Sequence, residues 1–442
     1  MSSRPQRFTA RLRALAGLSL ATVLLFPTSA RAEKVLLKDK DWEVYTDGRV
    51  GAFASYVIGD GAPVPTKQIT LPNGMVVPEV INGGQWPLTS KNDSADPTEQ
   101  GSVNMMRIRS GFIGNVLGIG VRNQLLPDLK LTGYVQLWTY IESDARNKGL
   151  PVYPDARQGY AKIEGSWGSV TAGRTRALYS RGATDINVMY AHRWGVGFPN
   201  QIDSKGPTQG MVGFGVLGSG FAGALIYGTP VLAGFKLDIG LFDPATVGST
   251  GWSRTTLPRA EGELTFEHAL GTAGKVVLFA NGAFQKLYKT GYCPPTPGPC
   301  EETVKGFGYG GRLEVGPVHL GVAGHYGKGL GLSYMLEQSQ AATDPASFLR
   351  AFDGYYAQGQ VVLDKFDLFA GWGITRLFLT AVDKTLPQYS NVKYQMGING
   401  GVVYNLSPNL HFDLEYMRAE GKWYLGEQQI LNCFATGMTV SW

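Results

Sequence analysis

Few residues of this sequence have the types and spacing that catalysis or cofactor binding requires. The segment GFGYGG (306–311) matches the glycine pattern of a dinucleotide-binding turn, but such a turn lies between a strand and a helix. Here the chain continues as RLEVGPVHLGV, which reads as another strand and turn. We therefore interpret these glycines as places where neighbouring strands or loops approach closely. No convincing Ser and His pair suggests an activated nucleophile, so the sequence predicts neither an enzyme nor a bound cofactor.

Histidine and acidic side chains do not form a recognisable metal site either. The segment NDSAD (92–96) offers oxygen ligands, but it lacks the Gly and Glu positions of a calcium loop. His319 and His325 share one face of a predicted strand, yet no histidine has the spacing of metal ligands on a helix. We predict no bound metal. The five histidines are His192, His268, His319, His325 and His411.

Residues 1–32 have the pattern of a secretory signal peptide. A segment with four arginines precedes the apolar stretch Ala14 to Phe26, and Ala30-Arg31-Ala32 is a small-x-small cleavage site. The apolar stretch is shorter than the roughly 20 residues that a membrane-spanning helix needs. The five arginines of this segment account for the excess of 40 Lys and Arg over 35 Asp and Glu. Residues 33–442 thus carry no formal net charge, and no nucleic-acid partner is indicated.

The three cysteines divide into a local pair and a single residue. Cys293 and Cys300 bracket PPTPGP, and in an exported chain a disulfide across such a loop is the natural interpretation. A zinc site is disfavoured because no histidine or second cysteine pair lies nearby. Cys433 is predicted to be a free structural thiol.

Alternation of apolar and polar residues is the dominant pattern. In the final segment CFATGMTVSW, Phe434, Met438, Val440 and Trp442 share one face of a strand. Charged residues make up only 17% of the chain, against about 25% in a typical soluble domain. Many long strands with one apolar and one polar face predict a barrel closed in lipid, because open edges would leave backbone groups unsatisfied in hydrocarbon. Similar alternation appears in LKLTGYVQLW (129–138), FKLDIGLF (235–242), VKYQMGINGGVVYN (392–405) and LHFDLEY (410–416).

The predicted fold class is therefore all-β, a transmembrane antiparallel up-and-down β-barrel formed by residues 33–442 as one domain. Short turns alternate with long polar stretches, as in bacterial outer-membrane barrels, and the even strand number also fits. The expected strand at 118–126/128–143 is the least regular, because residues 115–130 contain a turn or a bulge. About sixteen strands are expected, at 43–57, 104–116, 118–126/128–143, 157–165, 169–176, 222–228, 235–243, 259–268, 275–288, 304–315, 318–330, 355–363, 366–376, 392–405, 409–418 and 430–442.

Two segments resemble the general diffusion porins of Gram-negative bacteria. ARQGYAKIEGSWGSVTAGRTRALY (156–179) is similar to the strands before the constriction loop of that family, and GALIYGTPVLAGFKLDIGLF (223–242) to the hairpin after it. The last strand resembles the family's assembly signal, although the family usually ends in Phe rather than Trp. The resemblance implies a homotrimer in the outer membrane, inserted by the barrel-assembly machinery and in contact with the lipid bilayer and lipopolysaccharide. Each protomer would conduct small hydrophilic solutes through its own pore.

The resemblance also implies that the third long loop, about residues 177–221, folds inward and narrows the pore. In the family, a wall of arginines faces acidic loop residues there. Such arginines either set the electric field at the narrowest point or hold the loop by ion pairs, and both interpretations stay open. Their local excess predicts a weak anion preference. The predicted constriction residues are Arg107, Arg109, Arg174, Arg176, Arg181 and Asp185.

Three other functions remain as alternatives. A substrate-selective channel on the same barrel would use an aromatic track, for which Tyr134, Trp138, His319 and His325 are candidates. A structural or adhesive surface barrel would have its lumen sealed by a loop. An outer-membrane hydrolase would need a Ser and His pair on a smaller barrel.

Overall fold

The computed structural model describes most of the chain that follows the predicted signal peptide, which itself lies outside the described residues. Among the described residues, no helix is long and apolar enough to cross a membrane. The described residues are 33–82, 99–111, 114–139, 154–188, 211–245, 247, 252–253, 257–289, 298–333, 335–336 and 340–442.

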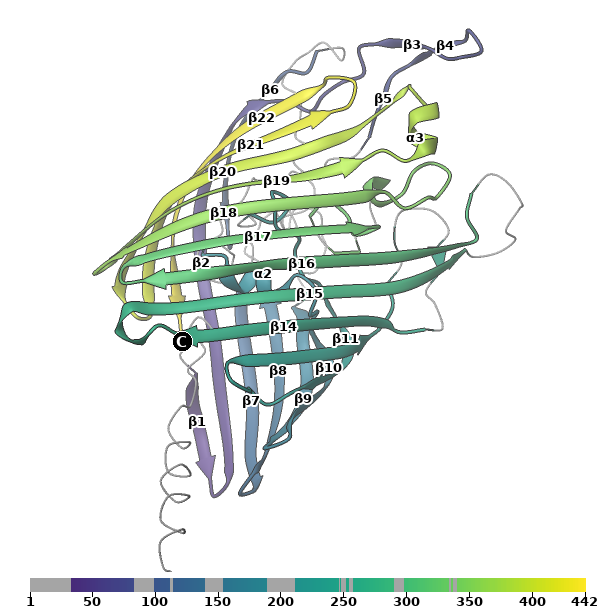
Figure 1. The fold of residues 1–442 in the computed structure, drawn as a ribbon. Coiled ribbons are helices and arrows are strands. Elements are labelled where there is room, and N and C mark those ends of the chain that lie inside the picture. Colours follow the sequence, from purple (N-terminus) through teal and green to yellow (C-terminus); the bar gives the residue numbers. More distant parts are fainter. Residues whose placement is uncertain are drawn as a thin grey trace, which may run out of the picture.

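The described strands form a closed antiparallel barrel of sixteen strands (Figure 1). Each strand pairs with the next along the chain, and β22 pairs with β2 from Arg49 opposite Ser441 to Gly59 opposite Leu431. Closure removes the open edges that lipid cannot satisfy. The barrel strands are β2 (Trp42–Asp60), β6 (Ser102–Arg109) with β7 (Asn115–Leu126), β8 (Leu129–Thr139), β9 (Asp155–Gly165), β10 (Gly168–Arg176), β11 (Phe221–Gly228), β12 (Phe235–Phe242), β14 (Arg259–Ala269), β15 (Gly274–Lys289), β16 (Glu301–Val315), β17 (Val318–Lys328), β18 (Ala351–Leu363), β19 (Phe366–Phe378), β20 (Tyr389–Ser407), β21 (Leu410–Trp423) and β22 (Gln428–Ser441).

Strands β6 and β7 act as one interrupted barrel strand. Both pair with β2, β6 along Phe53 to Asp60 and β7 along Trp42 to Arg49. The prediction of separate strands at 104–116 and 118–126/128–143 was therefore wrong in its grouping. The first of these strands continues through 118–126, and β8 is a strand of its own. The chain between Arg109 and Val116 is longer than the stretch of β2 opposite it, so the extra residues interrupt the ladder as a bulge does.

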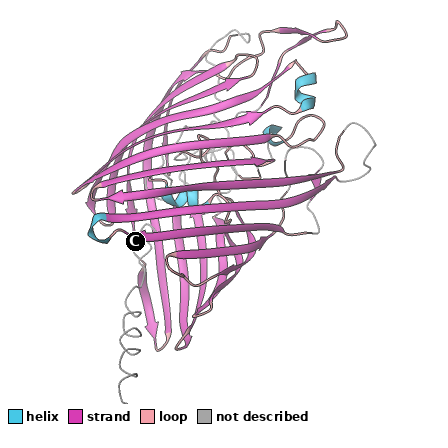
Figure 2. Ribbon diagram, in the orientation of Figure 1, coloured by secondary structure: helices cyan, strands magenta, loops and turns pink. Residues whose placement is uncertain are grey.

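Short turns and long connections lie at opposite ends of the barrel (Figures 1 and 2). Beside the short turns, β1 (Lys34–Asp39) forms a hairpin with the start of β2. The long connections carry β3 (Gln68–Thr70), β4 (Val76–Pro78), β13 (Trp252–Ser253) and α3 (Ala381–Thr385). A further short strand, β5 (Val80–Asn82), pairs in parallel with the first residues of β20.

A buried ion pair ties two of the long connections together. Arg350 donates from Nε and Nη2 to the two carboxylate oxygens of Asp383 in α3, at 2.8 and 2.6 Å. Both side chains are buried, and Arg350 also reaches the Asn391 side chain at 3.2 Å. Because a bidentate guanidinium–carboxylate pair fixes both distance and orientation, it holds the connection before β18 against the one before β20.

The two faces of each strand differ as the alternation predicts. In β22, Phe434, Met438 and Val440 are exposed on the outer face, whereas Cys433 and Ala435 are buried. Trp442 follows β22, and its backbone exchanges two hydrogen bonds with Gly48 of β2 at 2.8 and 3.0 Å. Its indole lies so close to Gly48 that a Cβ there would overlap it. The end of the chain is thus fastened to the first barrel strand.

Candidate pore constriction

The chain after β10 contacts the inner face of the barrel. Ala177, Leu178 and Tyr179 are buried, and the helix α2 (Arg181–Ile186) begins after Ser180, which has a left-handed φ of 66°. In Figures 1 and 2, α2 lies between the front and rear walls of strands. The strand residues that hold this segment are buried and alternate with exposed, outward-facing neighbours. Each of these contacts therefore lies on the inner side of the wall.

Glu261 of β14 binds the backbone where the segment leaves β10. One carboxylate oxygen accepts the N–H groups of Leu178 and Tyr179 at 2.8 and 2.9 Å. The other oxygen accepts Arg259 Nε at 2.5 Å. Because buried donors without partners are costly, this carboxylate specifies the path of the backbone. Burial also raises the pKa of Tyr179, which stays a neutral phenol.

Glu263 lies two residues further along the same face and binds the start of α2. Its carboxylate accepts Arg181 Nε at 2.6 Å and the Gly182 N–H at 2.7 Å. Arg181 also forms an ion pair with Asp238 of β12. Burial opposes the charge of Arg181, but the two carboxylates outweigh it and raise the pKa of the guanidinium. Arg181 therefore stays charged and acts as a fastening between the loop and the wall.

The far side of α2 is fixed by β18 and β15. Tyr356 Oη donates to the carbonyl of Ala183 at 2.9 Å, and Gln358 Nε2 donates to that of Ile186 at 2.7 Å. Gly182 faces Phe279 so closely that a Cβ would overlap the ring. Helix α2 therefore spans from the β14 carboxylates to β18 across the inner face of β15–β17, which it also contacts.

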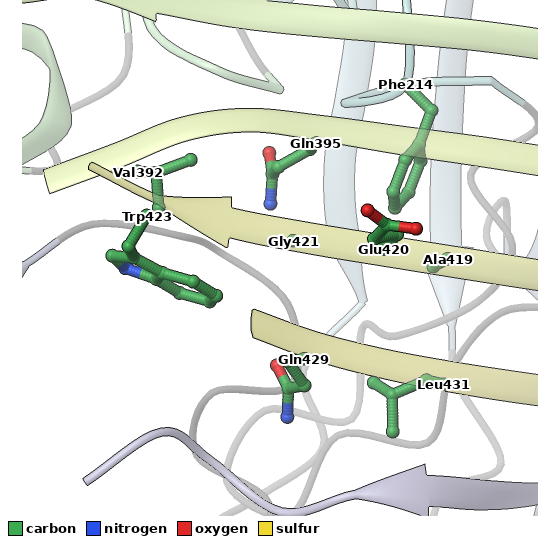
Figure 3. A pocket seen from close by; sticks show the side chains of 9 residues that line it. All are labelled: Phe214, Val392, Gln395, Ala419, Glu420, Gly421, Trp423, Gln429 and Leu431. Atoms are coloured by element: carbon green, nitrogen blue, oxygen red, sulfur yellow. The ribbon is translucent and has the colours of Figure 1, made fainter. Parts of the chain in front are cut away.

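The returning part of the connection, residues 211–220, lies against β19 and β20. Gly215 N–H donates to Thr375 Oγ1 at 2.9 Å, and the Phe214 ring packs against Gly397. Figure 3 shows Phe214 beside a small cavity of about 20 Å³, lined also by Gln395, Glu420 and Trp423. The described parts of the connection thus contact walls on both sides of the barrel interior.

The predicted constriction residues have different positions. Arg176 forms an ion pair with Asp185, whose carboxylate stays half exposed. The backbone of Arg107 pairs with Ser55 and that of Arg109 with Phe53, whereas their side chains lie outside the described part. Arg174 is exposed and follows Ala172 on the face of β10 that pairs with outward-facing Leu225. That position separates Arg174 from the residues that hold the loop.

The alternation of the strands alone predicts Glu261 and Glu263 to be charges of the inner face, without a role in holding the loop. The same parity predicts ten further inner-face charges: Asp47, Arg49, Arg107, Arg109, Lys130, Arg312, Glu314, Lys393, Asp413 and Glu415. The segment EGE (261–263) gave the available signal, because two carboxylates two residues apart share one side of a strand. Lys393 differs from this expectation. It lies at a bulge of β20, is exposed, and has its ammonium 6.0 Å from the ring centroid of Tyr424.

A comparison with protein-family models gives one match: residues 17–422 fit the model described as Gram-negative porin. The chain belongs to the Gram-negative porin family. This porin is therefore an outer-membrane channel protein for passive diffusion and not an enzyme. No protein in the curated set matches it significantly.

Solved structures with the same fold are themselves porins and channels. The porin superposes on the outer membrane channel DcaP of Acinetobacter baumannii with a TM-score of 0.63 at 15% identity, covering 92% of this chain and 99% of that one. For the anion-selective porin of Comamonas acidovorans the values are 0.55, 13%, 91% and 100%. For OmpF of Salmonella typhi they are 0.50, 11%, 92% and 99%. At these identities the likeness shows the shared fold.

The predicted disulfide is described at one end. Cys300 is disulfide-bonded, whereas Cys293 lies outside the described residues, so the pairing stays a prediction. Cys433 is a buried free thiol on the inner side of β22.

Proposed function

We propose that this porin passes small hydrophilic solutes and ions through a pore narrowed by the connection between β10 and β11. The observation that carries the proposal is the pair of carboxylates, Glu261 and Glu263, which binds three backbone N–H groups and one guanidinium of that connection. A loop held in this way keeps its position while solutes pass, and a rigid narrow zone is what size-limited diffusion needs.

The charges of the narrow zone divide into two roles. Arg181 is balanced by Glu263 and Asp238, and Arg176 by Asp185. We therefore assign these two arginines mainly to holding the loop by ion pairs, rather than to setting the electric field of the pore. We propose that Arg107 and Arg109 supply the remaining field and a weak anion preference. Asp185, half exposed, is the proposed carboxylate on the loop side.

The reversal potential in a salt gradient tests the anion preference. We expect a small reversal potential, with the sign of a channel that is more permeable to anions than to cations. The double variant Arg107→Gln, Arg109→Gln should bring this potential towards zero. Clear cation selectivity of the unmodified porin would contradict the proposal. The residue Arg418 provides a matched control, because it pairs with outward-facing Ile398 and its removal should leave the reversal potential unchanged.

The substrate-selective alternative is less favoured. An aromatic track must present its rings to the solute, but Tyr134, Trp138 and His325 are each only 6% exposed. Tyr134 Oη donates to Asp47 at 2.8 Å, and Arg157 covers the Trp138 ring with its guanidinium carbon 4.7 Å from the centroid. These rings are engaged in the wall. Conductance that rises linearly with concentration for several solutes supports diffusion, whereas saturation by one solute would favour the alternative.

We further propose a homotrimer that contacts lipopolysaccharide and is inserted by the barrel-assembly machinery through Phe434, Met438, Val440 and Trp442. A solved structure of OmpT of Vibrio cholerae, similar to this chain with a TM-score of 0.50 at 12% identity, is described as a trimer form. Conductance steps in groups of three would support the trimer, and single independent steps would contradict it.

A further inference from the structure

The connection between β2 and β6 is fastened to the barrel by a cluster of three charged side chains, at the end that carries the long connections. Lys67 and Glu79 belong to this connection, and Glu427 lies between β21 and β22. The Lys67 ammonium forms one ion pair with Glu427 and another, at 3.6 Å, with Glu79. It also donates to the carbonyl of Leu425 at 2.5 Å. One lysine thus joins two carboxylates, although Lys67 and Glu427 are 360 residues apart in sequence. We call Lys67, Glu79 and Glu427 the latch.

The backbone that follows Glu79 is held at the same place. The Val80 N–H donates to the Gln388 carbonyl at 2.7 Å, and β5 pairs in parallel with the first residues of β20. Trp423 Nε1 donates to the Asn82 carbonyl at 3.2 Å. In Figure 1, β3 and β4 extend beyond the barrel from this end. The latch therefore lies where the connection between β2 and β6 meets the ends of the strands.

The latch has one positive and two negative groups, and both carboxylates are buried. The side chains of Glu79 and Glu427 are 0% and 7% exposed. Burial and the adjacent Glu427 raise the pKa of Glu79. Burial also opposes the charge of Glu427, but hydrogen bonds from Lys67 and Ser390 outweigh it and lower the pKa of Glu427. The two carboxylates are therefore unequal: Glu427 stays charged against Lys67, and Glu79 retains a proton more readily than an ordinary glutamate.

The elements packed around the latch do not bring a second positive charge to its carboxylates. Among the described residues, only Lys67 forms an ion pair with Glu79 or Glu427. Because a buried charge without a partner is costly, a proton on Glu79 is the simplest way to neutralise the second carboxylate. The other titratable groups on these elements are Asp60 of β2, the ion-paired Arg350 and Asp383, Tyr389 and Lys393 of β20, and Glu420 and Lys422 of β21.

We propose that Lys67, Glu79 and Glu427 form a pH-sensitive latch, which holds the connection between β2 and β6 more tightly in mildly acidic than in mildly alkaline solution. The contribution of Glu79 is complete below the ordinary pKa of a glutamate and is lost as the pH rises through the raised pKa of Glu79. The contribution of Glu427 has the opposite sign and is lost only as the pH falls through the lowered pKa of Glu427. Between mild acid and mild alkali, Glu79 therefore sets the direction. This inference does not rest on the proposed narrowing of the pore, because the latch lies outside the barrel strands and makes no contact with α2.

Hydrogen exchange of residues 61–82, read by mass spectrometry of the full-length porin in detergent, tests the latch. Protection is compared at about pH 5.5 and about pH 8, after correction for the pH dependence of exchange in an unstructured peptide. The unmodified porin should show several-fold higher protection at the lower pH. Glu79→Gln resembles the neutral acid, because its amide still offers one donor and one acceptor. This variant should keep the higher protection at both pH values, whereas Glu427→Gln should lose protection at both. The matched control is Glu302→Gln, whose carboxylate pairs with Lys328 at another long connection, and its pH profile should match that of the unmodified porin.

Three results would overturn the latch: equal protection of the unmodified porin at the two pH values, higher protection at the alkaline one, or an undiminished pH dependence in Glu79→Gln. An equal loss of protection in Glu79→Gln and Glu427→Gln would show a structural cluster that does not titrate, and it also rejects the proposal. The profile of the unmodified porin decides the matter even where a variant does not fold. Conductance in planar bilayers is recorded on the same samples. A flat pH profile with intact conductance rejects the latch alone, whereas absent conductance in the unmodified porin rejects the pore.

Discussion

The substitution Glu261→Gln tests how the connection after β10 is held. A glutamine has nearly the shape of Glu261, but it carries one acceptor oxygen and one amide that only donates. In the native site one oxygen accepts the N–H groups of Leu178 and Tyr179, and the other accepts Arg259 Nε. In either orientation of the glutamine amide, its NH₂ group replaces a carboxylate oxygen that accepted a hydrogen bond. The NH₂ group then faces either the two backbone N–H groups or Arg259 Nε, and neither of these can accept its hydrogens. Leaving such a buried group unsatisfied costs about 1–3 kcal/mol, which corresponds to roughly a 5- to 150-fold larger population of the detached loop.

Single-channel recording in a planar bilayer is the assay. We expect Glu261→Gln to show more frequent and longer transitions between conductance levels, with a higher mean conductance when the loop is detached. The matched control is Glu164→Gln, which removes a carboxylate that pairs with Lys162 near a short turn, away from the loop. Heat-dependent mobility on a gel verifies that both variants are folded barrels. If folded Glu261→Gln gives traces that match those of Glu164→Gln, the carboxylate does not anchor the loop and our reasoning is refuted.

Three further predictions follow from the packing. Asp383→Asn should release the connection before β18 from α3, because breaking a buried ion pair costs roughly 3–5 kcal/mol; limited proteolysis should cut it at least tenfold faster than in Asp364→Asn, and equal rates would contradict this. Gly48→Val should reduce barrel assembly severalfold, since the new side chain overlaps Trp442 and the Val116 carbonyl; yields like those of the unmodified porin in a refolding assay would count against the fastening described above. Cys300→Ser should increase proteolysis around 290–300 without changing conductance, because the disulfide lies in a long connection; an altered conductance would show that this connection reaches the pore.

Much of the wall could be predicted from the sequence because alternation is a local property. Each strand reveals its two faces through residues two positions apart, and a barrel in lipid needs little else to be recognised. The junction of β6 and β7 could not be predicted in this way. It depends on how many residues lie opposite the gap in β2, and pairing between distant segments leaves no trace in either segment alone.

The site was less predictable for the same reason. Glu261 and Glu263 were recognisable as inward-facing carboxylates, but their partners Tyr179 and Arg181 lie 82 residues away in sequence. Asp185 was expected to face a wall of arginines across the pore, yet it forms an ion pair with Arg176 at the base of its own loop. Arg181, also expected on this loop, is bound to Glu263 and Asp238 of the barrel wall. Arg174 was expected in the wall of the pore, although the strict alternation of β10 already separated it from Thr175. For Arg174, the alternation of faces along β10 predicts the position of the side chain better than the resemblance of the segment to the family does.

The pairing of β2 with β22 also bears on how the protein matures. Arg49 meets Ser441 in the ladder, so the seam joins segments nearly the whole polypeptide apart. Contacts at such separation form slowly, because a long stretch of chain must first be brought together. Until this seam closes, a partly formed sheet has two edge strands whose unpaired N–H and C=O groups can pair with other chains. Maturation of this protein should accordingly be all-or-none, with shortened chains cleared from the cell envelope rather than retained as smaller pores.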